Sequence, residues 1–132
     1  MASIAVENKG DMAFEVKIGN RTMMMDVPPS MGGKDRAPTP TDVFAASLAA
    51  CINALVSAYC RDMKMACDGL KVTLDYEKLE KPSRLGKFKA RIIMPAGAKG
   101  WEARKDGILR AADRCPVHET IRMHEGLECT VE

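Results

Sequence analysis

Two cysteines, Cys51 and Cys115, stand in surroundings that suit thiol chemistry. Cys51 follows two alanines in AASLAACINA, and these small side chains leave room for another group to approach. Cys115 lies in RCPVHE, beside Arg114 and three residues before His118. Neighbouring positive charge lowers the pKa of a thiol, and the thiolate is the reactive form. A redox role for the two cysteines is therefore one interpretation of the sequence.

A metal site is a second interpretation of the same stretch. Cys115 and His118 have C-x-x-H spacing, and His124 follows closely. A zinc site needs another pair of well-spaced ligands, which the sequence does not offer. We therefore expect no metal and no cofactor, and we interpret His118 as a histidine that bonds a nearby carbonyl rather than as a general base.

The three other cysteines show no functional arrangement of charged neighbours. Cys60 follows Cys51 by nine residues in one predicted helix, which places the two on opposite faces and about 13 Å apart, too far for a disulfide. Cys67 falls at a helix-to-strand connection and Cys129 in a predicted strand. We expect Cys60, Cys67 and Cys129 to pack as small buried hydrophobes. The odd count of five cysteines argues against a full set of structural disulfides.

Length and composition indicate one soluble globular domain. The chain has 132 residues, of which 46% are hydrophobic and 29% charged, so disorder does not fit. A net charge of +2, with both signs interspersed, argues against a nucleic-acid or membrane-surface partner. The N-terminal stretch lacks the apolar run and basic leader of a secretory signal, so we expect a cytoplasmic protein.

The elements that must position the two cysteines follow from the patterning. Alternation on both sides of Gly19-Asn20 predicts a hairpin over about 12–27, and Pro and Gly make 28–38 a loop. Thr39 as N-cap, Pro40 as first helical residue and Asp42 in the first turn start a helix over about 40–62. That helix carries Cys51.

Further strands and a second helix complete the predicted domain. Alternating apolar residues predict two strands over about 69–94 and a final strand over about 126–131. Between them a helical stripe predicts a helix over about 101–115, which Pro116 ends or restarts at a kink. The order is β-β-α-β-β-α-β, an α+β domain.

The first helix is apolar on all sides. Between Val43 and Cys60 only Ser47, Asn53 and Ser57 interrupt the apolar run. We reject a membrane span, because alanine dominates and no aromatic belt flanks the run. One small sheet covers only one side of such a helix, so the other side is expected to meet a second copy of the chain.

The segments PTPTDVFAASLAACI and AADRCPVHETI, in this order and at this separation, closely resemble the OsmC/Ohr family of osmotically inducible and organic hydroperoxide resistance proteins. The resemblance extends over nearly the whole chain, including the hairpin and the loop PPSMGG. It implies the OsmC-like fold, an intertwined homodimer with two central helices packed on antiparallel sheets.

The resemblance also implies roles for the two cysteines. In the family's peroxidases the cysteine matching Cys51 attacks the hydroperoxide, and the one matching Cys115 resolves the resulting sulfenic acid as a disulfide. The implied substrate is a small organic hydroperoxide. The implied reductant is an external dithiol, of lipoyl type in some members.

Two supporting residues of the family match less closely. The family's peroxidases use an arginine of the N-terminal hairpin, where this chain has Arg21, with Arg36 in the loop as the less favoured substitute. Their glutamate, ten residues before the reactive cysteine, is Thr41 here. Asp42 and Glu119 are the candidate carboxylates to replace it, although Asp42 is better explained as a charge at the helix N-terminus.

Two functional hypotheses follow. The first is a thiol peroxidase that uses Cys51 and Cys115 on organic hydroperoxides. The second, prompted by Thr41, is an OsmC-like protein without efficient peroxidase activity that binds a small apolar ligand or senses redox state. The sequence does not identify the physiological hydroperoxide, the reductant or the supporting arginine.

Overall fold

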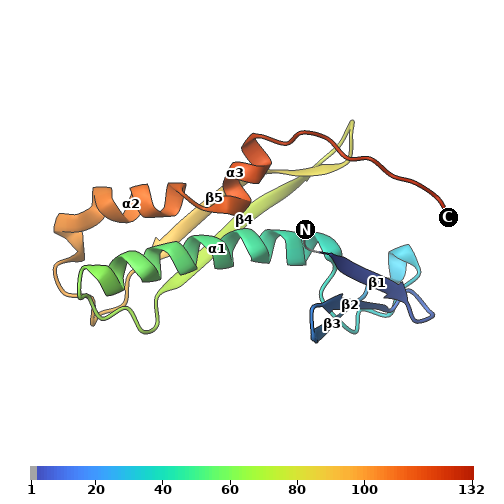
Figure 1. Cartoon of the computed structure of the whole chain (residues 1–132), viewed down its shortest axis with the longest axis horizontal. Helices are drawn as coiled ribbons and strands as arrows, with labels where there is room; N and C mark the ends of the chain where they lie inside the picture. Colours follow the sequence, from blue (N-terminus) through green and yellow to red (C-terminus); the bar gives the residue numbers. More distant parts are fainter. Residues whose placement is uncertain (1–2) are drawn as a thin grey trace. The chain divides into compact units, whose positions relative to one another are not determined.

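The computed structural model describes residues 3–132 as an α+β protein (Figure 1). The described chain forms two compact units that divide between Ala45 and Ala46. Helix α1 (Pro40–Asp62) begins in the N-terminal unit and continues in the C-terminal unit. The predicted helix over about 40–62 is confirmed, and Thr39 caps it, since its Oγ1 accepts the backbone N–H of Asp42 at 3.2 Å.

The N-terminal unit is built on a three-stranded antiparallel sheet. Strand β2 (Phe14–Ile18) lies between β1 (Ile4–Asn8) and β3 (Arg21–Met25). The turn Gly19-Asn20 joins β2 to β3 with Ile18 opposite Arg21, which confirms the predicted hairpin. Strand β1 is an addition to the prediction. All five of its residues are exposed, so no alternation between buried and exposed positions marks it.

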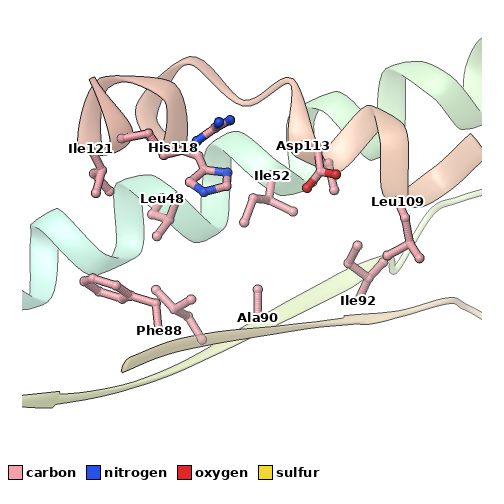
Figure 2. A pocket seen from close by; sticks show the side chains of 12 residues that line it. Leu48, Ile52, Phe88, Ala90, Ile92, Leu109, Asp113, His118 and Ile121 are labelled. Atoms are coloured by element: carbon pink, nitrogen blue, oxygen red, sulfur yellow. The ribbon is translucent and has the colours of Figure 1, made fainter. Parts of the chain in front are cut away.

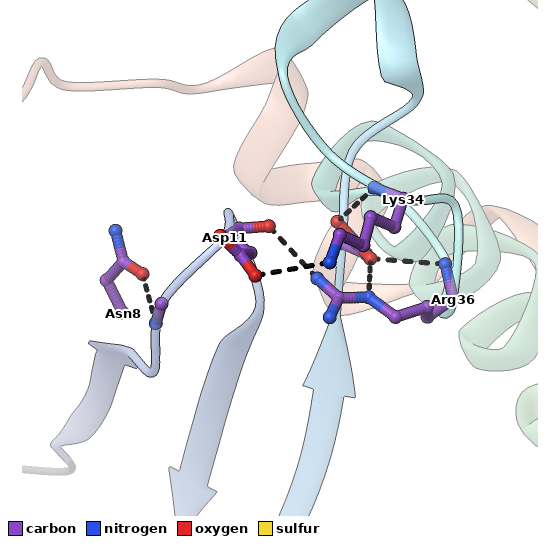
Figure 3. Close-up of polar contacts among 6 residues, drawn as sticks. Asn8, Asp11, Lys34 and Arg36 are labelled. Carbon is purple, nitrogen blue, oxygen red and sulfur yellow. Dashed lines mark hydrogen bonds and ion pairs between the residues drawn. The ribbon is translucent and has the colours of Figure 1, made fainter.

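The loop after β3 is held by a buried carboxylate, that of Asp26 (Figure 3). Its Oδ2 accepts the Nε–H of Arg36 at 2.6 Å, and its oxygens also accept the backbone N–H groups of Val27 at 2.7 Å and Arg36 at 3.1 Å. Arg36 donates from Nη2 to the carbonyl oxygen of Asp11 at 3.0 Å. These contacts, with the short 3-10 helix Pro29–Met31, order a loop that Pro and Gly otherwise leave irregular.

Gly33 is required by this close packing of the loop. A Cβ at this position would overlap the carbonyl oxygen of Val27 and lie 2.6 Å from Oδ1 of Asp26. We expect Gly33→Ala to destabilise the protein by about 1–3 kcal/mol, as overpacking does elsewhere, measured by urea denaturation. Gly97→Ala is the matched control, because a Cβ there would meet only ordinary contacts at 3.9 Å. Equal stability of the two variants would contradict the prediction.

The C-terminal unit packs helices against a two-stranded antiparallel sheet (Figure 1). Strands β4 (Lys71–Leu79) and β5 (Arg84–Ile93) pair with Val72 opposite Ile92 and Leu74 opposite Ala90, which confirms the two predicted strands. Their apolar side chains pack against the core formed by α1 and the later helices.

The predicted second helix is divided. A 3-10 turn (Trp101–Arg104) leads into α2 (Lys105–Asp113), and α3 (Pro116–Arg122) follows after a break. Pro116 is the first residue of α3 and Cys115 its N-cap. Proline lacks an N–H and fits the first helical turn, so Pro116 begins a new helix at this point. Of the two outcomes predicted for Pro116, an end or a restart of the helix, the structure shows the restart.

Within the C-terminal unit α1 buries one stripe of side chains. Leu48, Ile52, Val56 and Cys60 recur at every fourth position, and each is at most 8% exposed. This stripe joins Ile108 and Cys115 in one cluster, while other faces of α1 stay partly exposed. Helix α1 is long and apolar enough to span a membrane, but core helices of soluble proteins also meet these criteria of length and hydropathy. The prediction that the chain's own sheet covers only one side of α1 agrees with this packing.

The predicted final strand over about 126–131 is wrong. Residues 124–132 have no regular secondary structure, and Leu127 and Val131 are 85% and 100% exposed. Alternation of apolar residues is not sufficient for a strand, because a strand also needs a neighbour to accept and donate its backbone hydrogen bonds. Neither sheet of the described chain supplies that neighbour to this segment.

Candidate active site

The structure brings the thiols of Cys51 and Cys115 into contact. Cys51 lies in the middle of α1 and Cys115 at the N-cap of α3, and the two side chains interact as hydrogen-bonding thiols. Cys115 is fully buried, whereas Cys51 is partly exposed. Both are free thiols. The two cysteines are 64 positions apart in the sequence, and the sheet and α2 lie between them and return the chain to α1.

The surroundings of Cys115 keep its thiol protonated. Burial raises the pKa of Cys115 most, and the hydrogen bond with Cys51 raises it further. The backbone N–H groups of His118 and Val117, in the first turn of α3, act in the opposite direction but do not prevail. A protonated Cys115 can donate its S–H to the sulfur of Cys51. The pair is therefore asymmetric, with Cys51 as the more accessible sulfur and the acceptor.

This asymmetry predicts the order in which the two thiols react. With limiting iodoacetamide at neutral pH, we expect reduced native protein to be alkylated at Cys51 at least about tenfold faster than at Cys115, because Cys51 is the more accessible thiol and burial raises the pKa of Cys115. Peptide mapping by mass spectrometry measures the two rates. Exposed Cys129 serves as the internal control for reagent activity. Faster labelling of Cys115 would contradict the assignment.

An apolar cavity of about 320 Å³ lies between the helices and the sheet of the same unit. Figure 2 shows Leu48 and Ile52 of α1 facing Phe88 and Ala90 of β5, with His118 on the helical side. The remaining walls are also mainly aliphatic, from Leu74, Ile92, Leu109, Ala112 and Ile121, and Asp113 and Arg122 add charge. Neither cysteine lines the cavity, although Leu48 and Ile52 flank Cys51 along α1. The cavity fits a small apolar molecule.

His118 therefore contributes to a cavity wall, and its backbone rather than its ring acts on Cys115. No group of three metal-ligating side chains occurs among residues 3–132. The residues that line the cavity could not be identified from the sequence, because they come from five separate elements.

The predicted supporting residues lie as follows. Arg21 is the exposed first residue of β3, in the N-terminal unit. Arg36 belongs to the same unit, and its guanidinium is bonded to Asp26 and to the carbonyl of Asp11, which gives it a structural role. A role of either arginine at the thiolate stays a prediction.

The predicted carboxylates and Thr41 are also placed on helices. Thr41 and Asp42 are exposed in the first turn of α1, where the Thr41 hydroxyl lies 3.2 Å from that of Thr39. Glu119 of α3 pairs with Arg122 at 2.7 Å. The described contact of Glu119 is thus with Arg122 of its own helix, and a role of Asp42, Thr41 or Glu119 at the thiolate stays a prediction.

The prediction for the three other cysteines is wrong in two respects. Cys60 and Cys67 form a disulfide, so they are not separate packing residues, although Cys60 is fully buried. Cys129 is exposed rather than buried. The sequence held a signal for this disulfide, because Cys60 and Cys67 are seven residues apart across the end of a helix. The prediction from the sequence considered only a pairing of Cys60 with Cys51.

Comparison with known proteins places this architecture in a family. The family model described as OsmC-like protein matches residues 32–132, which include both Cys51 and Cys115. This chain belongs to the OsmC-like family. The resemblance of the two cysteine segments is thereby confirmed. No curated protein sequence matches this OsmC-like chain significantly.

Solved structures agree with the OsmC-like fold. A protein of Psychrobacter arcticus 273-4, assigned to the osmotic stress and detoxification responses, has 24% identity and a TM-score of 0.80, with 95% of this chain and 90% of that chain covered. The OsmC-like protein of Mycoplasma pneumoniae has 18% identity and a TM-score of 0.70, with 94% and 89% covered. The organic hydroperoxide resistance protein OhrB of Bacillus subtilis has 16% identity and a TM-score of 0.63, with 94% and 92% covered. At these identities the similarity shows the fold.

Proposed function

We propose that this OsmC-like protein is a thiol peroxidase that reduces organic hydroperoxides. The observation that carries the proposal is the contact between Cys51, which is partly exposed, and Cys115, which is buried. A nucleophile and a resolving thiol in contact need no rearrangement of the chain to form a disulfide. The name of the Bacillus subtilis relative, an organic hydroperoxide resistance protein, is consistent with this substrate class.

The proposed cycle has three steps. The Cys51 thiolate attacks one oxygen of the hydroperoxide, the O–O bond breaks, and the alcohol leaves after taking up a proton, so that Cys51 becomes a sulfenic acid. Cys115 then attacks the Cys51 sulfur, the disulfide forms and water leaves. An external dithiol, of lipoyl type, returns two electrons and two protons and restores both thiols.

Further parts of the proposal concern the assembly and the supporting groups. We propose a homodimer, because Phe44 on α1 and Ile4 and Val6 on β1 are large apolar side chains that the chain's own described residues leave 45–63% exposed. Arg21 is the proposed supporting cation for the thiolate. We propose a cytoplasmic location, where free thiols stay reduced between turnovers.

The test is steady-state consumption of cumene hydroperoxide and of hydrogen peroxide with dihydrolipoate as the reductant. We expect the organic substrate to be consumed at least about tenfold more efficiently, because apolar walls such as Leu48 and Ile52 stand next to Cys51 along α1. Consumption of neither peroxide above the rate without protein would contradict the proposed function.

A second candidate function is binding of a small apolar ligand. It is favoured by the cavity of about 320 Å³, whose lining contains neither cysteine. It predicts that an apolar fluorescent probe binds equally well to the wild type and to Cys51→Ser, and that Ala90→Trp, which fills the cavity, abolishes binding. Binding that Ala90→Trp leaves unchanged would exclude the cavity as the site.

A further inference from the structure

Cys60 and Cys67 form a second cysteine pair that the proposed peroxidase cycle does not use. Their Cα atoms lie 6.3 Å apart, and the two residues are joined in a disulfide. That separation is within the usual range for bridged cysteines. Cys60 lies in the last turn of α1 and Cys67 in the connection to β4.

The backbone itself brings the two sulfur atoms together. Lys64 has a left-handed conformation, with φ of 57°, and its N–H donates to the carbonyl of Arg61 at 3.0 Å. The N–H of Met65 donates to the carbonyl of Cys60 at 2.8 Å. These two bonds form a Schellman motif, which reverses the chain at the end of a helix. The reversal carries Cys67 back toward Cys60.

The far end of the connection is held as well. The N–H of Leu70 donates to the carbonyl of Cys67 at 2.9 Å, and Nδ2 of Asn53 on α1 donates to the carbonyl of Leu70 at 3.1 Å. None of these hydrogen bonds involves sulfur. The two thiols therefore stay adjacent when the disulfide is reduced, so opening and closing of the bond needs little movement of the backbone.

The two sulfur atoms differ in access. Cys60 is 0% exposed and belongs to the same buried cluster as Cys115. Cys67 is partly exposed, and its neighbours Ala66 and Asp68 are exposed. A reagent in solution therefore meets Cys67 first.

We propose that Cys60 and Cys67 are a second redox centre, oxidised by hydroperoxides and reduced by external dithiols. The Cys67 thiolate attacks a hydroperoxide oxygen, the O–O bond breaks and the alcohol leaves, which converts Cys67 to a sulfenic acid. The Cys60 thiol then attacks that sulfur, the disulfide forms and water leaves. A dithiol attacks Cys67, the accessible sulfur, and returns two electrons and two protons. The proposal rests on the proposed function only for the class of oxidant and reductant.

The first test uses a chain in which Cys51, Cys115 and Cys129 are replaced by serine, so that the proposed peroxidase pair is absent. After reduction and one equivalent of cumene hydroperoxide, we expect an intact mass lower by two hydrogens, restored by dihydrolipoate without denaturant. With Cys60→Ser added, Cys67 is expected to gain one oxygen and to react with dimedone. With Cys67→Ser added instead, buried Cys60 is expected to stay unmodified. Unchanged mass in the chain that keeps both cysteines would overturn the proposal.

The second test needs no substitution. Arg61 and Lys64 separate Cys60 from Cys67, so trypsin leaves the disulfide as a link between two peptides. In wild-type protein trapped with N-ethylmaleimide we expect this linked pair after hydroperoxide treatment and its loss after native dihydrolipoate treatment. A link that opens only in denaturant would make the disulfide purely structural and overturn the proposal. A Cys60–Cys67 link that forms and opens while no Cys51–Cys115 link forms after hydroperoxide treatment would refute the proposed function alone.

Discussion

In a Cys67→Ser background, which removes the second proposed redox centre, Cys51→Ser is expected to lower dithiol-dependent hydroperoxide consumption by roughly a thousand-fold or more. A serine hydroxyl is not ionised at neutral pH and does not attack the O–O bond, so the first covalent step is lost. The fold is expected to persist, because Cys51 is only partly buried and serine is close to it in size. Stopped-flow or end-point peroxide assays with dihydrolipoate measure the effect.

Two matched variants make this result specific. Cys129→Ser changes an exposed cysteine and is expected to leave the rate within about twofold of the wild type. Cys115→Ser is expected to keep the first turnover and to accumulate a Cys51 sulfenic acid, which dimedone traps, because the resolving thiol is missing. Full activity of Cys51→Ser would show that another group reduces the peroxide.

Asp26→Asn is expected to lower the melting temperature by roughly 5–10 °C, since it removes the charged partner of Arg36 from a buried site. The carboxylate of Asp26 is 1% exposed and accepts hydrogen bonds from the Arg36 side chain and from three backbone N–H groups. Asp11→Asn is the matched control. It breaks the exposed pair with Lys34 at 3.2 Å, and a change of no more than about 2 °C is expected there.

The difference between wild type and Asp26→Asn is also expected to depend on pH. The hydrogen bond from Arg36 is the main cause that holds the pKa of Asp26 well below its usual range, against the opposing effect of burial. A carboxyl group with a lowered pKa in the folded state stabilises that state above the pKa of the unfolded chain, about 4, and the stabilisation is lost as the pH falls further. In melting curves recorded from pH 7 to pH 2, the difference in melting temperature between wild type and Asp26→Asn should shrink progressively below about pH 4. A constant difference over this range would contradict the assignment.

The local elements could be predicted because their signals are local. Gly19-Asn20 between two alternating runs fixes a hairpin, and Thr39 followed by Pro40 fixes the start of α1. Cys51 and Cys115 drew attention through their neighbours and through the family resemblance. Their contact could not be derived from spacing, because it depends on how the sheet and α2 return the chain to α1.

The failures of prediction share a physical cause. The alternation at Leu127 and Val131 is real, but no strand of the described chain pairs with it. The pairing of Cys60 with Cys67 depends on the left-handed backbone conformation of Lys64. This conformation is uncommon for a lysine and cannot be predicted from the residue type. Both the missing strand and the disulfide depend on backbone conformation and hydrogen bonding, which the periodicity of side chains does not describe.

The most direct test of the central claim is the identity of the first disulfide formed. Fully reduced wild-type protein receives one equivalent of cumene hydroperoxide, is trapped with N-ethylmaleimide within the first turnover, and is mapped by mass spectrometry after digestion. We expect a Cys51–Cys115 linked peptide pair, which is absent in Cys51→Ser. Peroxide reduction with Cys51 and Cys115 both recovered as alkylated thiols would contradict it.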